Sequence, residues 1–196
     1  MRFSTLLVAT HNAGKLREIR EVLGGWVGEL RAQTQVPDAP PPADETADTY
    51  QGNALLKAEA LHAATGLPTM ADDSGLEVAA LGGRPGLHSS RYGTSDGDRI
   101  RRLLEELAGV PEPDRGARFV CVVALALPGG ARHFFEGVCP GSILTAPRGA
   151  GGFGFDPVFL VEGLDRSMAE LPIGRKNQLS HRARALAALR DWMARD

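Results

Sequence analysis

The sequence predicts an α/β fold with a mixed β-sheet, and three observations support this prediction. Over the first half of the chain, strand patterns alternate with helix patterns, as in folds whose strands are covered by helices. Gly129-Gly130 then joins two strand patterns into a β-hairpin, which a purely parallel sheet does not contain. The chain has 196 residues, of which 43% are hydrophobic, so it can bury a sizeable core. We therefore expect a single domain over residues 1–196.

The N-terminal half supplies the alternating elements. Residues 3–10 (FSTLLVAT) are typical of a buried strand, and residues 30–34 indicate a second, short strand. Between them, a helix ending at Gly24-Gly25 is predicted from apolar residues at helical spacing, namely Leu16, Ile19, Val22 and Leu23. After a proline-rich loop (PDAPPPAD), residues 50–65 predict a helix that Gly66 terminates. Residues 67–73 predict a strand that ends in acidic residues.

The C-terminal half contains the hairpin and two more helices. The hairpin strands are predicted at residues 118–127 and 132–138. Ser95 or Asp96 can cap a helix whose buried side carries Ile100, Leu103, Leu104 and Leu107. Ser180 can cap a C-terminal helix with its apolar side facing inward, at Ala183, Leu186, Leu189 and Met193. The remaining segments are predicted to be two loops and a short apolar run, at residues 82–92, 149–154 and 157–161.

Charge and composition argue against several classes of protein. The chain carries 22 Lys and Arg against 24 Asp and Glu, a net charge of −2, whereas proteins that hold long nucleic acids usually carry a basic excess. No apolar stretch approaches a membrane span, and the N-terminus lacks a signal-peptide pattern. Cys121 and Cys139 form no CxxC pair, so neither a disulfide framework nor a zinc site is indicated, and Cys121 is predicted to be a core residue. We expect a cytoplasmic protein that binds a small anion, not a nucleic acid or a membrane.

The segment THNAGK, residues 10–15, joins the first strand to the first helix. The N–H groups and the dipole at a helix N-terminus favour anions, Lys15 adds a positive charge, and Gly14 allows close approach. The segment is not a Walker P-loop, because Ala9 and Leu16 stand where that motif needs Gly and Ser or Thr. Taken alone, it is equally well explained as an ordinary turn with a solvent-exposed lysine.

The segment ADDSGL, residues 71–76, places two carboxylates side by side. Because side chains alternate along a strand, Asp72 and Asp73 cannot point the same way unless the strand has ended. One of them could meet a metal or a water while the other braces the loop, at the strand end where α/β enzymes keep their chemistry. An Asx-type turn would explain the same residues without a function.

A second acidic pair, Asp44-Glu45, lies just after the proline-rich loop. Oxygen ligands spread over two loops suit Mg²⁺, which keeps several waters and relies on substrate phosphates. Asn53 and Lys57 share one face of the next helix. In isolation, Asp44-Glu45 is better explained as a charge pair at a helix N-terminus.

The glycine-rich loop GAGGFGFD contains a formal GxGxxG pattern, but an apolar strand follows it, so a dinucleotide site is not indicated. We interpret it as a mobile loop that presents Phe153 or Phe155 to a flat base; the alternative is that both rings are core.

The segment GRKNQLSHR gathers cations at a helix start, where they oppose the dipole unless an anion or a carbonyl-rich ligand is present; a solvated basic turn is the other explanation.

Six segments together resemble one family, the inosine/xanthosine triphosphate pyrophosphatases, also called the non-canonical purine NTP pyrophosphatases or the HAM1-like family. They occur in the family's order along nearly the whole chain: THNAGK, ET with NALLKA, ADDSGL, PGLHSSRY, GGFGFDPVF and SHR. The resemblance implies an elongated mixed β-sheet flanked by helices, in two lobes with a nucleotide cleft between them. It also implies a homodimer that uses Mg²⁺. The implied reaction is hydrolysis of ITP, dITP or XTP to the monophosphate and pyrophosphate, which cleanses the nucleotide pool.

The resemblance also implies roles for particular residues. Asp73 looks like the general base and a metal-linked carboxylate, with Asp44 or Glu45 as the second acidic ligand. The triphosphate loop would comprise Thr10, His11, Asn12, Ala13, Gly14 and Lys15. Other substrate contacts would come from Ser74 and Lys176, and the base-stacking segment would be Phe153, Gly154, Phe155 and Asp156. His181 and Arg182 would bind the 6-oxo edge of the purine, which is an acceptor where adenine presents an amino donor.

Three alternative functions remain open at this point. A related pyrophosphatase could prefer modified pyrimidine or canonical NTPs, which substrate profiling would separate. A nucleotide-binding module without turnover would lack the base or a metal carboxylate, but Asp73, Asp44 and Glu45 are all present. A nucleic-acid-binding module is disfavoured by the net charge of −2.

Overall fold

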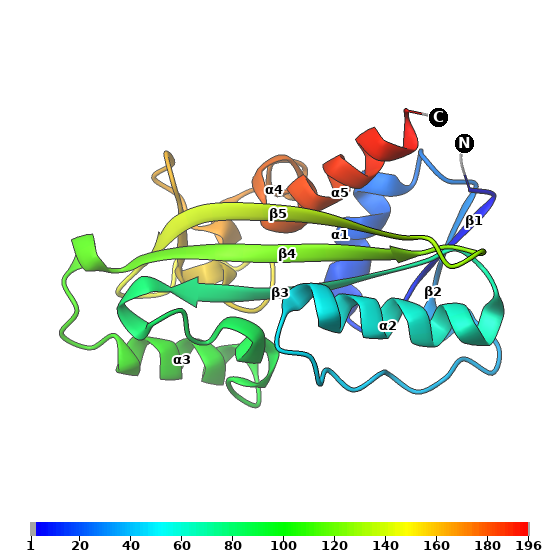
Figure 1. The fold of residues 1–196 in the computed structure, drawn as a ribbon. Coiled ribbons are helices and arrows are strands. Elements are labelled where there is room, and N and C mark those ends of the chain that lie inside the picture. The colour runs from blue at the N-terminus through cyan, green and yellow to red at the C-terminus, as the bar shows by residue number, and fades with distance from the viewer. Residues whose placement is uncertain (1–2, 196) are drawn as a thin grey trace. The chain divides into compact units, whose positions relative to one another are not determined.

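The computed structural model describes residues 3–195, which contain a six-stranded sheet with the order β2-β1-β3-β4-β5-β6 (Figure 1). Strand β1 runs parallel to both β2 and β3, whereas β5 and β6 are antiparallel. The predicted α/β fold with a mixed sheet is therefore confirmed. The strands are β1 (Thr5–Val8), β2 (Glu29–Ala32), β3 (Thr69–Val78), β4 (Gly116–Ala126), β5 (Arg132–Ile143) and β6 (Phe159–Val161).

The chain divides into two compact units, and the strands β3, β4 and β5 contribute residues to both. Unit 1 combines the chain up to Asp73 with residues 121–137 and the chain from Arg182 onward. Unit 2 combines residues 74–120 with residues 138–181. Because each unit has its own hydrophobic core, each is described by itself.

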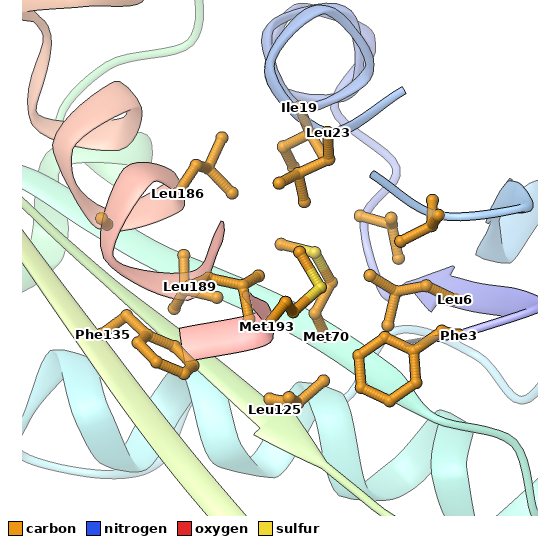
Figure 2. Close-up of a cluster of buried hydrophobic side chains, with 14 of the residues drawn as sticks. Phe3, Leu6, Ile19, Leu23, Met70, Leu125, Phe135, Leu186, Leu189 and Met193 are labelled. Atoms are coloured by element: carbon orange, nitrogen blue, oxygen red, sulfur yellow. The ribbon is translucent and has the colours of Figure 1, made fainter. Parts of the chain in front are cut away.

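Unit 1 packs helices against both faces of its strands. Along β1, Leu6 and Val8 belong to a core shared with α1 (Ala13–Leu23) and α5 (His181–Met193). Figure 2 shows Leu6 in this core with Ile19 of α1 and Leu186 of α5. The alternate residue Leu7 belongs to a second cluster, which it shares with α2 (Tyr50–Thr65). Since successive side chains of a strand point to opposite faces, α1 and α5 cover one face and α2 covers the other.

Local sequence sets the ends of these helices. The Asn12 side chain accepts a hydrogen bond from the Lys15 N–H at 3.0 Å and so caps α1, while Thr49 caps α2 through the Gly52 N–H at 3.0 Å. Helix α2 ends at Gly66, whose φ of 68° is a left-handed conformation that favours glycine. The predicted helices at 50–65 and after residue 12 are confirmed.

Unit 2 contains α3 (Asp96–Glu106) and α4 (Ile173–Leu179). Ser95 caps α3 by accepting from the Asp98 N–H at 3.1 Å, which settles the choice between Ser95 and Asp96 as the cap. The core of unit 2 joins α3 to β3, β4, β5 and β6, through residues such as Leu76, Leu103, Phe119, Ile143 and Phe159.

Two predictions about the elements are wrong. The strand predicted at 67–73 does not end at its acidic residues: β3 continues to Val78, because Leu76 and Val78 are buried in the core of unit 2. The alternative of an Asx-type turn at Asp72-Asp73 is wrong for the same reason. The sequence pattern also missed the short helix α4, which precedes the predicted C-terminal helix.

No helix within residues 3–195 combines the length and the apolar character needed to cross a lipid bilayer. Both cysteines are buried and unbridged, and Cys121 lies in the core of unit 1, as predicted.

Candidate active site

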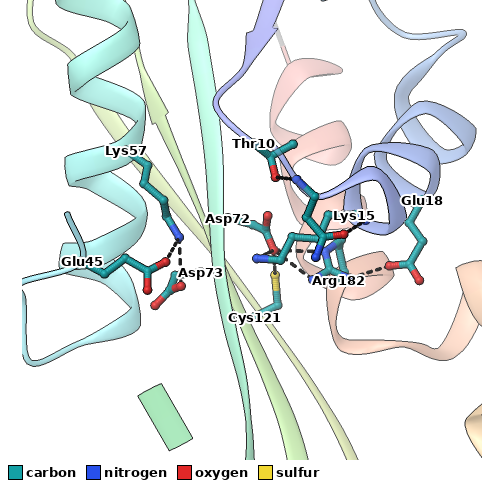
Figure 3. A network of polar contacts seen from close by, with 10 residues as sticks. Thr10, Lys15, Glu18, Glu45, Lys57, Asp72, Asp73, Cys121 and Arg182 are labelled. Carbon is teal, nitrogen blue, oxygen red and sulfur yellow. Dashed lines mark hydrogen bonds and ion pairs between the residues drawn. The ribbon is translucent and has the colours of Figure 1, made fainter. Parts of the chain in front are cut away.

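The two adjacent carboxylates of β3 belong to different sets of contacts (Figure 3). Asp72 contacts Lys15 of α1 and Arg182 of α5, whereas Asp73 contacts Lys57 of α2. Because β3 continues through both residues, their side chains point to opposite faces of the strand, toward the helices that cover each face. One strand thereby places one carboxylate on each face of unit 1.

The segment Thr10–Lys15 forms the start of α1. The Asn12 N–H donates to Thr10 Oγ1 at 3.2 Å, which folds the loop back on itself, and residues 11–13 are exposed. The first turn of α1 carries no acidic side chain, so nothing there competes with an anionic ligand for the helix N-terminus. Lys15 is not a solvated lysine, because its Nζ lies 3.0 Å from Asp72 Oδ2 and its side chain is 16% exposed.

Arg182 is the largest fully buried side chain, and it joins two acids. Its Nη1 donates to Glu18 Oε2 at 2.5 Å, and its Nε and Nη2 donate to Asp72 Oδ2 at 3.1 and 3.0 Å. Burial alone would raise the pKa of Asp72, but Lys15 and Arg182 outweigh it and hold the pKa well below its usual range. The contacts therefore favour the charged form of Asp72, and all three guanidinium nitrogens of Arg182 are used in binding it and Glu18.

On the other face, Lys57 bridges two carboxylates. Its Nζ lies 2.9 Å from Glu45 Oε1 and 2.9 Å from Asp73 Oδ1. Burial raises the pKa of Asp73, Lys57 acts against this rise, and nearby Glu45 adds to it, with a net upward shift. For Lys57, burial would lower the pKa, but Asp73, Asp72 and Glu45 raise it above the ordinary value. Lys57 is thus a firmly protonated cation between two acids.

The structure distinguishes the two residues of the Asp44-Glu45 pair. Glu45 reaches Lys57 and so lies beside Asp73, whereas Asp44 is exposed. The alternative of a helix N-terminal charge pair is wrong, because α2 begins only at Tyr50. Buried Asn53 fixes this segment, since its Oδ1 accepts a hydrogen bond from the Ala47 N–H at 2.9 Å.

We call these residues of unit 1 the phosphate cluster: Lys15, Glu18, Glu45, Lys57, Asp72, Asp73 and Arg182. Four carboxylates face three cations in it, which leaves one net negative charge. Across residues 3–195, no three His, Cys, Asp or Glu side chains converge in a way that could hold a metal ion by themselves. Glu45 and Asp73 supply carboxylate oxygens, which fit Mg²⁺, since that ion commonly takes one or two protein carboxylates and completes its shell with water and phosphate.

Unit 2 contains the predicted base-stacking segment together with Lys176 and His181, whereas Arg182 belongs to unit 1. Asp156 Oδ2 accepts hydrogen bonds from the Phe153 N–H at 2.9 Å and from Lys176 Nζ at 2.5 Å. The same ammonium group lies 4.7 Å from the centroid of the Phe153 ring, within range of a cation–π contact. Gly152 has φ of 73°, and a Cβ there would lie 2.0 Å from Asp156 Oδ2, so this turn requires glycine. Asp156 therefore shapes the loop that carries Phe153.

The two phenylalanines of this loop have different surroundings. Phe155 is buried in the core of unit 2, with its ring 6.2 Å from that of Tyr92, whereas Phe153 is partly exposed. Of the two, Phe153 is the ring that can meet a ligand. Gly154 is held from outside the loop, because its N–H donates to Asp96 Oδ2 at 2.7 Å.

His181 is buried and lies parallel to a ring of β4. Its imidazole centroid is 4.7 Å from that of Phe119 with an interplanar angle of 14°, and Phe119 in turn contacts Phe159 at 4.4 Å. This stack fixes the plane of the imidazole. We call these residues of unit 2 the base cluster: Phe119, Phe153, Asp156, Lys176 and His181.

Sequence reasoning missed three residues that organise these clusters. Glu18 and Phe119 each stand in a segment that reads as ordinary helix or strand, and only tertiary contacts reveal their partners. Asp96 was considered as a helix cap, but its carboxylate instead reaches the glycine-rich loop. The predicted substrate contact Ser74 follows Asp73 in β3 and is half-buried.

The chain is similar to known proteins over nearly its whole length. Residues 6–192 match the sequence model of the Ham1 family. A dITP/XTP pyrophosphatase of Gloeobacter violaceus is 52% identical over 191 residues, which cover 96% of this chain and 93% of the relative. A dITP/XTP pyrophosphatase of Geobacter sulfurreducens is 49% identical, with 96% of each chain covered. The solved structure of a HAM1 protein from Coxiella burnetii superposes with a TM-score of 0.88 at 39% identity, covering 98% of this chain and 99% of that one.

Proposed function

Because the chain belongs to the Ham1 family, we propose that it hydrolyses non-canonical purine nucleoside triphosphates, such as ITP, dITP and XTP, to the monophosphate and pyrophosphate. The relatives named dITP/XTP pyrophosphatase align over nearly the whole chain, so the proposal concerns the entire protein. The observation that carries the proposal is the pair of oppositely facing carboxylates on β3, one with the phosphate-loop lysine and the other with Glu45 and Lys57.

The phosphate cluster would bind the triphosphate. Lys15 and the N-terminus of α1 offer positive charge and backbone donors at the exposed segment 10–15, and Lys57 offers a second ammonium. The cluster alone carries one net negative charge, so a divalent cation at Glu45 and Asp73 would make it attractive to a polyanion. We infer that Mg²⁺ is this cation; when bound, it would spread the charge of the phosphates and stabilise the leaving pyrophosphate.

Asp73 would act as the general base. A base must accept a proton from the attacking water, and the raised pKa of Asp73 makes it a better acceptor than an ordinary aspartate while leaving it an anion that Lys57 contacts. Lys15, Lys57 and the helix N-terminus would hold the phosphates in line for attack at the α-phosphorus, which is the main contribution that proteins make to phosphoryl transfer. Asp72 would not take part in proton transfer, because Lys15 and Arg182 hold its pKa down.

The base cluster would select the purine. Phe153 offers a partly exposed ring on which a base can stack, and Asp156 and Lys176 hold that ring in place. Lys176 and His181 would donate hydrogen bonds to the 6-oxo group. Adenine carries a 6-amino group at this position, which is itself a donor, so it could not accept these hydrogen bonds. The resemblance assigns the same edge to Arg182, but its nitrogens bind Asp72 and Glu18, so we propose that Arg182 positions Asp72 and Lys15 instead.

We also infer that the protein works as a homodimer, as the family resemblance implies, and that it is located in the cytoplasm, as the sequence pattern predicts. A nucleotide-binding module without turnover is disfavoured, because the carboxylates proposed as base and metal ligand, Asp73 and Glu45, are both present and both contact Lys57.

The test is pyrophosphate release from ITP, XTP, GTP and ATP, each measured with and without Mg²⁺. Pyrophosphate from ITP and XTP alone, and only with the metal, is the expected result. Equal turnover of all four substrates would contradict the role of the base cluster, and turnover without metal would contradict the role of Glu45. Absence of pyrophosphate from every substrate would contradict the proposed activity.

A further inference from the structure

We propose that Lys57 is an internal counter-ion that holds Glu45 and Asp73 in place and competes with the divalent cation for these two carboxylates. The inference rests on the proposed function, which assigns the cation to this pair. It adds that cation binding requires Lys57 to leave, and that substrate phosphates favour this exchange. The observation behind it is a single ammonium group 2.9 Å from an oxygen of each acid.

The position of Lys57 is set by the fold. Its neighbours Ala54, Ala58 and Leu61 are fully buried and fix the face that α2 presents to β3. The Lys57 side chain is only 15% exposed, so water does not compete strongly for its ammonium group. The backbone at each acid is placed independently of Lys57, at Asp73 by β3 and at Glu45 by the segment that Asn53 anchors, whereas Lys57 holds the two carboxylate groups. The pair is therefore preformed, and Lys57 occupies the position where both carboxylates converge.

Charge decides what removal of Lys57 does. Two like charges that share a site repel, so Glu45 and Asp73 need a cation between them. A second cation brought to the same oxygens is repelled by the ammonium group, and at a protein surface two unit charges about 4 Å apart interact strongly enough to change an equilibrium constant by more than about tenfold. Removal of the Lys57 charge should therefore tighten binding of a divalent cation by at least about tenfold in the absence of nucleotide.

The exchange also links the cation to the substrate. An ammonium group displaced from Glu45 and Asp73 remains attached to α2 and has to find new partners. Phosphate oxygens of a bound triphosphate supply them, so triphosphate and cation should each raise the affinity of the other. Without Lys57, this part of the coupling is lost.

The experiment measures binding of Mn²⁺ by electron paramagnetic resonance of the free ion, with the full chain and no nucleotide. Lys57→Met removes the charge at similar side-chain length, and Lys57→Gln is a second variant in case the first does not fold. The matched control is Arg132→Met, which removes an equal charge from an exposed arginine that pairs with Glu59 of the same helix, α2. A second series repeats the titrations with a non-hydrolysable ITP analogue.

The expected result is a dissociation constant for Mn²⁺ at least about tenfold lower in Lys57→Met than in the wild type, with Arg132→Met much closer to the wild type. The analogue should tighten Mn²⁺ binding more in the wild type than in Lys57→Met. Equal or weaker Mn²⁺ binding by both Lys57 variants, or no binding by any form, would overturn the proposal. Failure of the metal assignment itself looks different: Glu45→Gln and Asp73→Asn would then bind Mn²⁺ as the wild type does.

Discussion

Arg182 donates two hydrogen bonds to a single oxygen of Asp72, from Nε at 3.1 Å and from Nη2 at 3.0 Å. Its third nitrogen binds Glu18, and all three side chains are almost completely buried. An ion pair in such surroundings contributes little net stability compared with apolar residues, but removal of one partner leaves uncompensated buried charge. The cluster is thus a sensitive point of unit 1, and it links α1, β3 and α5.

Arg182→Met should therefore lower the free energy of unfolding by about 3–5 kcal/mol, because it leaves Asp72 and Glu18 buried together without their common cation. Urea denaturation followed by circular dichroism measures the change. The control is Arg101→Met, which removes an exposed arginine paired with Asp98 and Glu105 and should change the free energy of unfolding far less. Similar losses in the two variants would contradict the structural role of Arg182.

Asp73→Asn should bind nucleotide but lose at least about a hundredfold in kcat, because an amide cannot accept the proton of the attacking water. Single-turnover kinetics gives the chemical step, and equilibrium titration with a non-hydrolysable ITP analogue gives binding separately. Asp48→Asn, at an exposed position near α2, is the control and should turn over as the wild type does. A near-normal kcat in Asp73→Asn would remove this residue as the base.

Much of the fold could be predicted because local signals coincide with tertiary structure. Helix α2 is bounded by Thr49 and Gly66, both of which have clear sequence preferences. The end of β3 could not be predicted in the same way. Acidic residues usually interrupt a buried strand, and only the contacts of Asp72 and Asp73 with Lys15, Arg182 and Lys57 allow the strand to continue.

The candidate site shows the same division. The segment 10–15 could be placed at a helix N-terminus from its sequence, because strand and helix patterns flank it. Contacts between distant residues of the site could not be predicted in this way: Glu18 and Arg182, which bind each other, are 164 positions apart along the chain. The resemblance assigns Arg182 to the purine edge, whereas its buried contacts with Asp72 and Glu18 favour a positioning role. Only the three-dimensional structure reveals these contacts.

Replacement of the two loop phenylalanines should have different consequences. Phe153→Ala should raise KM for all purine substrates, equivalent to about 1–3 kcal/mol of lost stacking, with little change in stability. Phe155→Ala should instead lower the free energy of unfolding by about 3–5 kcal/mol, because Phe155 is buried in the core of unit 2. Steady-state kinetics and thermal unfolding on both variants separate the effects. An unchanged KM in Phe153→Ala would show that its ring is structural.

The depressed pKa of Asp72 gives a prediction for the dependence of stability on pH. Burial favours the protonated acid, but Lys15 and Arg182 outweigh it, so the pKa in the folded state lies below the value of about 3.9 in an unfolded chain. A group whose pKa is lower in the folded state than in the unfolded chain contributes its full stabilisation at pH values above the unfolded pKa. For Asp72 this contribution is lost as pH falls below about 4. The difference in free energy of unfolding between the wild type and Asp72→Asn should therefore become smaller as pH falls.

Urea denaturation of both forms at about pH 7 and about pH 3 measures this difference. The free-energy gap between wild type and Asp72→Asn should be large at the higher pH and smaller at the lower one. Other acids titrate in both proteins and cancel in the comparison, while Asp48→Asn reports the effect of replacing an exposed aspartate. A gap that is the same at both pH values would mean that Lys15 and Arg182 do not stabilise the charged form of Asp72, and that the contacts on this face of β3 are held together by packing alone.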